Sequence, residues 1–173
     1  MIALPVVPFA LTFALTFAFP FALPFARKVL IADDGSALTS SLLSAFESLN
    51  IQSEVISPSM PPDMTDVCGL VVLGTQGNFD DDALKHAFLL AKKYGNALMQ
   101  SAKDGGAIFA AISAMDGVFG FGSNGIGNPI QGGLAGLVKT AAIEWQGVCC
   151  HAIDIAPEDQ ADSEIANKIA AEI

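Results

Sequence analysis

The sequence predicts an α/β fold of the Rossmann-like type, a three-layer sandwich of about five parallel strands with helices on both faces. Short apolar runs alternate along the chain with longer segments of helical period. Each run is apolar at nearly every position, as in strands that are buried on both faces of a sheet. The 173 residues are enough for one domain with a substantial core. We expect the strand order 2-1-3-4-5.

The elements follow from these apolar runs and the turn residues between them. Strands are predicted at residues 28–32, 54–56, 69–73, 106–112 and 151–155. Helices are predicted from Ser36 to about Leu49, from Asp80 to about Tyr94 with a continuation or restart over 97–102, from Asn128 to Trp145, and from Asp162 onward. Ser36 is expected to cap the first of these helices.

The helix over 128–145 has the most distinctive sequence. Pro129 suits its first turn, and Asn128 suits the cap before it. Gly132, Gly133 and Gly136 lie within about one turn of each other, although each costs a helix about 1 kcal/mol relative to alanine. We interpret these glycines as positions where a neighbouring element comes very close.

Residues 1–27 differ from the rest of the chain and are treated as a separate segment, with the domain proper at 28–173. From Phe9 to Ala26 large apolar residues alternate with small ones, which predicts an extended chain with one hydrophobic face. Several prolines disfavour a transmembrane helix, and the uncharged start disfavours a signal peptide. We expect a linker, or a segment that packs on its own domain or on a second copy in a homodimer.

The composition excludes some partners. The formal net charge is −10, with 8 Lys and Arg against 18 Asp and Glu, so nucleic acids and anionic membrane surfaces would be repelled. The cysteines Cys68, Cys149 and Cys150 have neither the number of a disulfide framework nor the spacing of a zinc site. Buried reduced thiols in a cytoplasmic protein are expected.

The first strand–helix turn does not favour a dinucleotide. A dinucleotide site needs several glycines there, so that backbone N–H groups reach the pyrophosphate. This turn has Gly35 alone, and the carboxylates of Asp33 and Asp34 lie where the phosphates would be. Like charges about 4 Å apart repel by about 1 kcal/mol in water and by more when they are partly buried.

Other glycines could still contribute to a ligand site. A literal Gly-x-Gly-x-x-Gly occurs at Gly120, Gly122 and Gly125, but it follows the fourth strand, so a flexible surface loop is the favoured interpretation. Gly74 ends the third strand. We therefore expect no cofactor site, with these four glycines and Gly35 as the residues that would form one. The acidic run 80–82 is interpreted as a helix start and not as a metal site.

The set of residues that a reductase needs is also incomplete. A short-chain reductase needs a tyrosine acid, a lysine four residues later and a serine at the preceding strand end. Ser113 and Lys139 fit two of these positions and are vestigial candidates, but Ala135 occupies the tyrosine position and Tyr94 belongs to another helix. Of the two histidines, His86 is expected to be exposed.

The run Gly-Gly-Leu-Ala-Gly-Leu-Val-Lys-Thr-Ala-Ala-Ile-Glu-Trp over 132–145 resembles a helix in ketoreductase domains of polyketide synthases and, more closely, polyunsaturated fatty acid synthases. It resembles their first, structural half, and the likeness covers about residues 28–157. The resemblance implies an inactive subdomain that binds no cofactor and braces an NADPH-binding catalytic half, which acts on substrates carried by acyl carrier protein. That half would begin beyond Ile173.

Two alternatives remain open at this point. The first is an NADPH-dependent short-chain reductase with a displaced site that uses Ser113 and Lys139 in a dimer. The second is a flavodoxin-like binding module with a ligand near residues 74–78 and 117–127, at the carboxyl ends of the strands.

Overall fold

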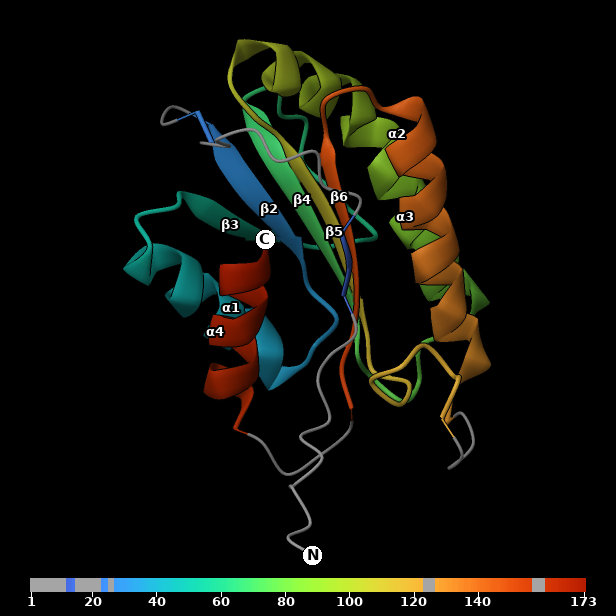
Figure 1. Ribbon diagram of the computed structural model, residues 1–173. Helices are drawn as coiled ribbons and strands as arrows, with labels where there is room; N and C mark the ends of the chain where they lie inside the picture. The colour runs from blue at the N-terminus through green and yellow to red at the C-terminus, as the bar shows by residue number, and fades with distance from the viewer. Residues whose placement is uncertain (1–11, 15–22, 25–26, 123–126, 157–160) are drawn as a thin grey trace, which may run out of the picture.

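Six strands form one sheet in the computed structural model, which describes residues 12–14, 23–24, 27–122, 127–156 and 161–173. The strands are β1 (Thr12–Ala14), β2 (Lys28–Ala32), β3 (Ser53–Ile56), β4 (Val67–Gly74), β5 (Ile108–Ser113) and β6 (Cys149–Asp154). Their order is β1-β6-β5-β4-β2-β3 (Figure 1). Strands β2 to β6 are parallel, and β1 runs antiparallel to β6. The predicted fold class and the 2-1-3-4-5 order of the five parallel strands, which is the flavodoxin-like order, are confirmed.

Helices cover both faces of this sheet (Figure 1). They are α1 (Ala37–Ser48), α2 (Asp81–Asp104), α3 (Gly132–Glu144) and α4 (Asp162–Glu172), with a short 3-10 turn, η1 (Pro129–Gln131), before α3. Helices α1 and α4 pack together on one face, and α2 and α3 lie on the other. Of the two alternatives predicted for residues 97–102, continuation of the helix is confirmed, because α2 runs unbroken through Gly95, beside which Trp145 packs.

The hydrophobic core has two layers because successive strand residues point to opposite faces. In β5, Phe109 and Ala111 belong to the layer under α2 and α3, whereas Ile108, Ala110 and Ile112 belong to the layer under α1 and α4. All six residues of this strand are buried. The near-continuous apolar runs seen in the sequence therefore correspond to strands that are covered on both sides.

The predicted start of the 128–145 helix is confirmed, with one difference. The side chain of Asn128 accepts a hydrogen bond from the backbone N–H of Ile130 at 3.1 Å, and Pro129 opens the 3-10 turn η1. The α-helix itself begins at Gly132. Asn128 also donates to the carbonyl oxygen of Phe79 at 2.6 Å, so this cap joins the helix to the loop after β4.

Three residues of the N-terminal segment are extended. Thr12, Phe13 and Ala14 pair with Ile153, Ala152 and His151 of β6. The remainder of residues 1–22 lies outside the described residues, as do its expected packing and dimer contacts.

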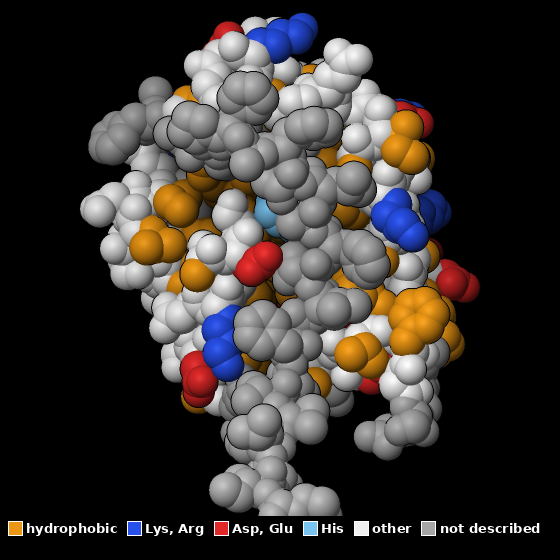
Figure 2. All heavy atoms as spheres, viewed as in Figure 1, with side chains coloured by type: hydrophobic (Ala, Val, Ile, Leu, Met, Phe, Trp, Pro, Cys, Tyr) orange, Lys and Arg blue, Asp and Glu red, His pale blue; other side chains and the backbone are white. Residues whose placement is uncertain are grey.

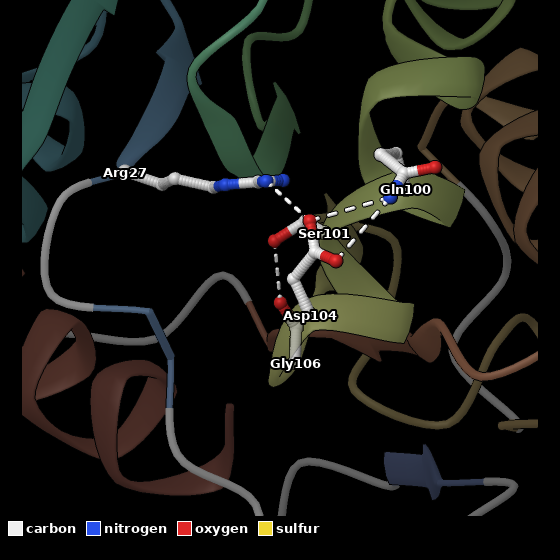
Figure 3. Close-up of polar contacts among 5 residues, drawn as sticks. All are labelled: Arg27, Gln100, Ser101, Asp104 and Gly106. Atoms are coloured by element: carbon white, nitrogen blue, oxygen red, sulfur yellow. Dashed lines mark hydrogen bonds and ion pairs between the residues drawn. The ribbon is translucent and has the colours of Figure 1, made fainter.

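The residue that leads into β2 is tied to the far end of α2 (Figure 3). Arg27 forms an ion pair with Asp104 at 2.6 Å, and Gln100 donates to both oxygens of the same carboxylate. The buried hydroxyl of Ser101 donates to the carbonyl oxygen of Gly106 at 2.7 Å, which satisfies the turn from α2 into β5. These contacts fix the amino-terminal edge of the sheet, opposite to the edge that carries the loops described below.

Candidate functional site

A crevice lies over the carboxyl ends of β2 and β4. Strand order reverses between these two strands, and ligands of open α/β sheets bind at such a switch point. The crevice has a volume of about 370 Å³, which is within the range of small-molecule sites. Its polar lining residues are Asp33, Asp34, Ser59, Gln76, Asn78, Asp80, Asp82 and His86. Its apolar lining residues are Ala32, Pro58, Val72, Leu73, Phe79, Ala83, Ala87 and Leu90.

The turn after β2 is held by its own carboxylates. Asp34 accepts hydrogen bonds from the backbone N–H of Ser36 at 3.0 Å, and from the N–H and hydroxyl of Thr75 at 2.9 and 2.6 Å. Asp33 accepts from the N–H of Gly35 at 2.9 Å and from the hydroxyl of Thr39 at 3.1 Å. Burial alone would raise the pKa of Asp34, but the hydrogen bonds from Ser36 and Thr75 hold it below its usual value. Asp34 therefore joins the two loops of the crevice as a carboxylate.

The loop after β4 is fixed from two sides. Asp80 caps α2 by accepting from the N–H of Ala83 at 2.9 Å, as the acidic start of this helix predicted. The buried Gln131 donates to the carbonyl oxygen of Gln76 at 3.1 Å and accepts from the N–H of Ala114 at 2.8 Å. Gln131 thus connects the loops that follow β4 and β5. Sequence reasoning missed this residue, because its partners are distant in the chain.

The glycine-rich loop after β5 is also organised by carboxylates. Asp154, which is fully buried at the end of β6, accepts from the hydroxyl of Ser113 at 2.6 Å and from the N–H groups of Met115 and Phe119, each at 2.9 Å. It also accepts a longer hydrogen bond, of 3.3 Å, from the N–H of Asp116. Asp154 therefore holds the first residues of this loop, 115–119, against the end of β6.

Asp116 binds the part of this loop that carries the glycine motif. Its carboxylate accepts from the N–H groups of Val118, Gly120 and Gly122 at 3.0, 2.7 and 2.9 Å. Burial opposes ionisation, but these hydrogen bonds hold the pKa of Asp116 below its usual value. Backbone N–H groups in this arrangement could hold a phosphate, but the side chain of Asp116 already takes that position. Gly125 lies outside the described residues.

The candidate glycines that the structure describes lie in different surroundings. Gly35 has φ +79° and makes the tight turn after β2. Gly74 is enclosed, since a Cβ there would lie 2.5 Å from Leu134 Cδ1 and 2.9 Å from Phe79 Cε2. Gly120, with φ +82°, and Gly122 belong to the loop held by Asp116, and no residue of that loop is among those described as lining the crevice.

The residues considered for reductase chemistry have different surroundings. Ser113 is buried and donates to Asp154, whereas Lys139 lies on the exposed side of α3. Tyr94 is buried in the core and donates to the carbonyl oxygen of Pro62 at 2.7 Å. Among the described residues, Ser113 and Tyr94 bond to Asp154 and Pro62 and not to each other or to Lys139, so the described structure does not assemble a serine–tyrosine–lysine set.

The histidines and cysteines have different surroundings. His86 is partly buried in the crevice, although we expected it to be exposed, and His151 is buried in β6. Burial lowers the pKa of His151 and raises that of Cys68 to about 11 and that of Cys150 to about 12, so these two thiols are protonated at neutral pH. Within the described ranges there is no group of three potential metal ligands and no helix long and apolar enough to cross a membrane.

Comparison with known proteins gives little similarity. No protein-family model and no curated protein matches the chain. A solved structure that matches is the crystal structure of diflavin flavoprotein A3 from Nostoc sp., with 12% sequence identity and a TM-score of 0.40. The match covers 84% of this chain and 86% of that chain.

The resemblance of residues 132–145 to a ketoreductase subdomain is therefore wrong, together with the place in polyketide or polyunsaturated fatty acid synthesis that it implied. The comparisons contain no ketoreductase or synthase, and the matching structure is a flavoprotein. Part of the helix pattern that suggested the resemblance has a local cause. Gly133 makes room for Leu84, whose Cδ2 lies 2.5 Å from the place where a Cβ would stand.

Proposed function

We propose that this chain is a flavodoxin-like binding module whose crevice at the β2–β4 switch point takes a small organic cation. One observation carries the proposal: the crevice combines an apolar wall with four carboxylates, and none of the residues described as lining it is Lys or Arg. A positive charge bound there would be attracted by the Asp residues on the rim, and an apolar group attached to it would contact Phe79 and Leu90.

A flavin nucleotide fits this crevice poorly. Its phosphate would need backbone N–H donors at the turn after β2, and those of Gly35 and Ser36 are already bound by Asp33 and Asp34, as is that of Thr75 in the adjacent loop after β4. The negative charge of the phosphate would also be repelled by the carboxylates of Asp33 and Asp34. The same argument applies to the pyrophosphate of NADPH. We therefore place the ligand among amines and guanidines with a compact apolar body.

The test is isothermal titration calorimetry of the full chain with three probes of similar shape, namely phenethylamine, 2-phenylethanol and phenylacetate. We expect the amine to bind about tenfold more tightly than the alcohol, which corresponds to about 1.4 kcal/mol, and the acid not to bind. The amine's affinity should fall as salt is added, because the rim charges are partly exposed.

Asp82 is the residue to change, since it lines the crevice and is exposed. Asp82→Asn should weaken the amine severalfold without changing the alcohol. Asp162→Asn, at the exposed start of α4, is the matched control and should leave both unchanged. A purified protein with the yellow colour of a flavin, or equal binding of the amine and the acid, would contradict the proposal.

A further inference from the structure

A second cavity lies at the amino-terminal edge of the sheet, on the face covered by α1 and α4. Its volume is about 350 Å³, which is within the range of small-molecule sites. Its floor is formed by the buried side chains of Cys68 in β4, Ile108 in β5 and Phe46 in α1. Leu49, which is 52% exposed, lies at the rim. The acidic crevice lies at the opposite edge of the sheet, and the two sets of described lining residues do not overlap.

The wall of this cavity is mostly apolar. The turn after α1 contributes Leu49 and Ile51, and the end of α4 contributes Ala170 and Ile173. Figure 2 shows hydrophobic side chains gathered on the left of the view, beside the place where Figure 1 draws the end of α1, β3 and the end of α4. An aliphatic chain bound in the cavity would therefore contact apolar side chains from two helices and the sheet.

Arg27 is the one charged residue among those described as lining the cavity. Its Nη2 donates to Asp104 at 2.6 Å (Figure 3), which is the only bond of the guanidinium to the described residues. A guanidinium has several N–H donors in a fixed fork, so most of them remain available to a ligand. The charge is felt inside the cavity, because burial raises the pKa of the Cys68 thiol to about 11 and Arg27 opposes that rise.

The net charge of −10 does not prevent an anion from binding here. Exposed charges are largely screened beyond about 8 Å at physiological ionic strength, so the local charges decide. The cavity has no Asp or Glu among its described lining residues, and Asp104 beside it is paired with Arg27. The end of α1 carries partial negative charge, but the carbonyl oxygen of Phe46 there is bonded to the N–H groups of Leu49 and Ile51 at 3.1 and 2.9 Å.

We propose that this cavity binds a medium-chain aliphatic monocarboxylate, whose carboxylate pairs with Arg27 and whose chain lies against Phe46, Leu49 and Ile108. The guanidinium selects the head group by charge and geometry, and each buried CH₂ group adds to the affinity. A compact acid such as phenylacetate has no chain to cover this wall. The site does not depend on the binding of a cation in the acidic crevice.

Isothermal titration calorimetry of the full chain with octanoate, hexanoate and 1-octanol tests the proposal. We expect octanoate to bind at least tenfold more tightly than 1-octanol, because the alcohol cannot pair with Arg27. Octanoate should also bind at least fivefold more tightly than hexanoate, because two more CH₂ groups are buried. The amide signals of Leu49 and Cys68 in ¹H–¹⁵N spectra should shift on addition of octanoate, which locates the ligand.

Two variants of the ion pair separate ligand binding from a structural role. Arg27→Gln should reduce the affinity for octanoate to that for 1-octanol. Asp104→Asn should have the opposite effect and strengthen octanoate severalfold, because it removes the carboxylate that competes for the guanidinium. If the pair only held the cavity in shape, both variants would weaken octanoate and 1-octanol alike, and that result would contradict the proposal.

Leu49→Gln should weaken octanoate and 1-octanol by similar factors, since both chains lose the same contact. Leu89→Gln is the matched control, because Leu89 is 45% exposed on α2 and is not among the residues described as lining the cavity. Asp82→Asn, in the acidic crevice, should also leave octanoate unchanged, so the two proposed sites can fail independently.

Three results would overturn the proposal. The first is that octanoate does not bind the full chain, or binds no better than 1-octanol. The second is that octanoate binding is unaffected by Arg27→Gln and Leu49→Gln. The third is that octanoate binds only after residues 1–22 are removed, because the occupant of the cavity would then be the chain's own N-terminal segment.

Discussion

At the scale of single residues, three aspartates engage backbone N–H groups that could otherwise hold a phosphate. Asp34, Asp116 and Asp154 accept hydrogen bonds from backbone N–H groups in the loops at the carboxyl ends of the strands. In dinucleotide-binding proteins such groups face a ligand. Here a carboxylate, whose charge has the same sign as that of a phosphate, satisfies them, so the loops are stable without a ligand. Asp34 and Asp116, whose pKa values are lowered, contribute stability that is present at neutral pH and lost below about pH 4.

His151 should produce a separate pH dependence at higher pH. Burial lowers its pKa below the ordinary 6.5, and Glu172 opposes this to a smaller extent. The unfolded chain therefore binds a proton at a pH where the folded chain does not, and stability is lost as pH falls through about 6.5 toward the folded pKa. We expect the free energy of unfolding, measured with urea, to fall as the pH is lowered from about 7 to about 5. The loss should be about 1.4 kcal/mol for each unit by which the pKa of His151 is lowered in the folded chain.

Two substitutions isolate the contribution of this histidine. His151→Gln should remove this part of the pH slope, whereas His86→Gln, in the crevice, should retain it. An unchanged slope in His151→Gln would show that other groups titrate in this range.

At the scale of elements, the end of β4 is fitted tightly against α3 and the loop before α2. Gly74 is the contact point, with Leu134 on one side and Phe79 on the other, and both of these side chains are buried. Protein interiors are packed closely enough that even one added carbon displaces its neighbours. The position of the crevice wall, which includes Phe79, therefore depends on a glycine at this strand end.

A pair of glycine substitutions tests this packing. Gly74→Ala should destabilise the protein by about 1–3 kcal/mol, because the new Cβ would stand 2.5 Å from Leu134 Cδ1. Gly77→Ala, three residues later, meets no atom within 4 Å and should change stability by less than about 1 kcal/mol. Urea unfolding of both variants gives the comparison, and equal effects would rule out the packing explanation.

At the scale of the whole molecule, the two core layers and five parallel strands are built from residues after 22, and β1 adds a three-residue edge. The backbone N–H groups of Cys149 and Ile155 donate to the carbonyl oxygens of Ala107, just before β5, and Ser113, at its end. Since N–H directions alternate along a strand, that of Ile153 also faces β5 and that of Ala152 faces β1. The protection that β1 gives to β6 can therefore be measured as hydrogen exchange at the amide of Ala152.

Removal of residues 1–22 should leave the fold intact and expose that amide. We expect the circular dichroism of the sheet and helices to be retained, and hydrogen exchange at Ala152 to accelerate at least tenfold. Exchange at Ile153 should stay slow and serves as the internal reference. Loss of the folded state on truncation would show that the first 22 residues are part of the core.

The sequence by itself determined the five parallel strands, the helices and their arrangement, because these depend on local periodicity and on caps, whereas the antiparallel pairing of β1 with β6 came from the structure. Apolar runs gave the strands, Asn128 and Pro129 gave the start of η1 before α3, and the acidic residues from Asp80 gave the start of α2. The strand order followed from the connections expected for such a fold. The charge of Asp33 and Asp34 also predicts that a phosphate is disfavoured at this turn, which stays a prediction.

Only the tertiary structure decided which loops meet and what their polar groups do. Asp34 binds Thr75, 41 residues away, and Asp154 binds Phe119, 35 residues away. No spacing rule in the sequence specifies such pairs, because they arise when parallel strands bring their carboxyl ends to one edge. For the same reason the helix over 132–145 was misleading: its glycines resemble a family pattern locally, but Gly133 accommodates Leu84 and Gly136 faces outward. What a glycine is for depends on what lies opposite it, and that is a property of the folded molecule.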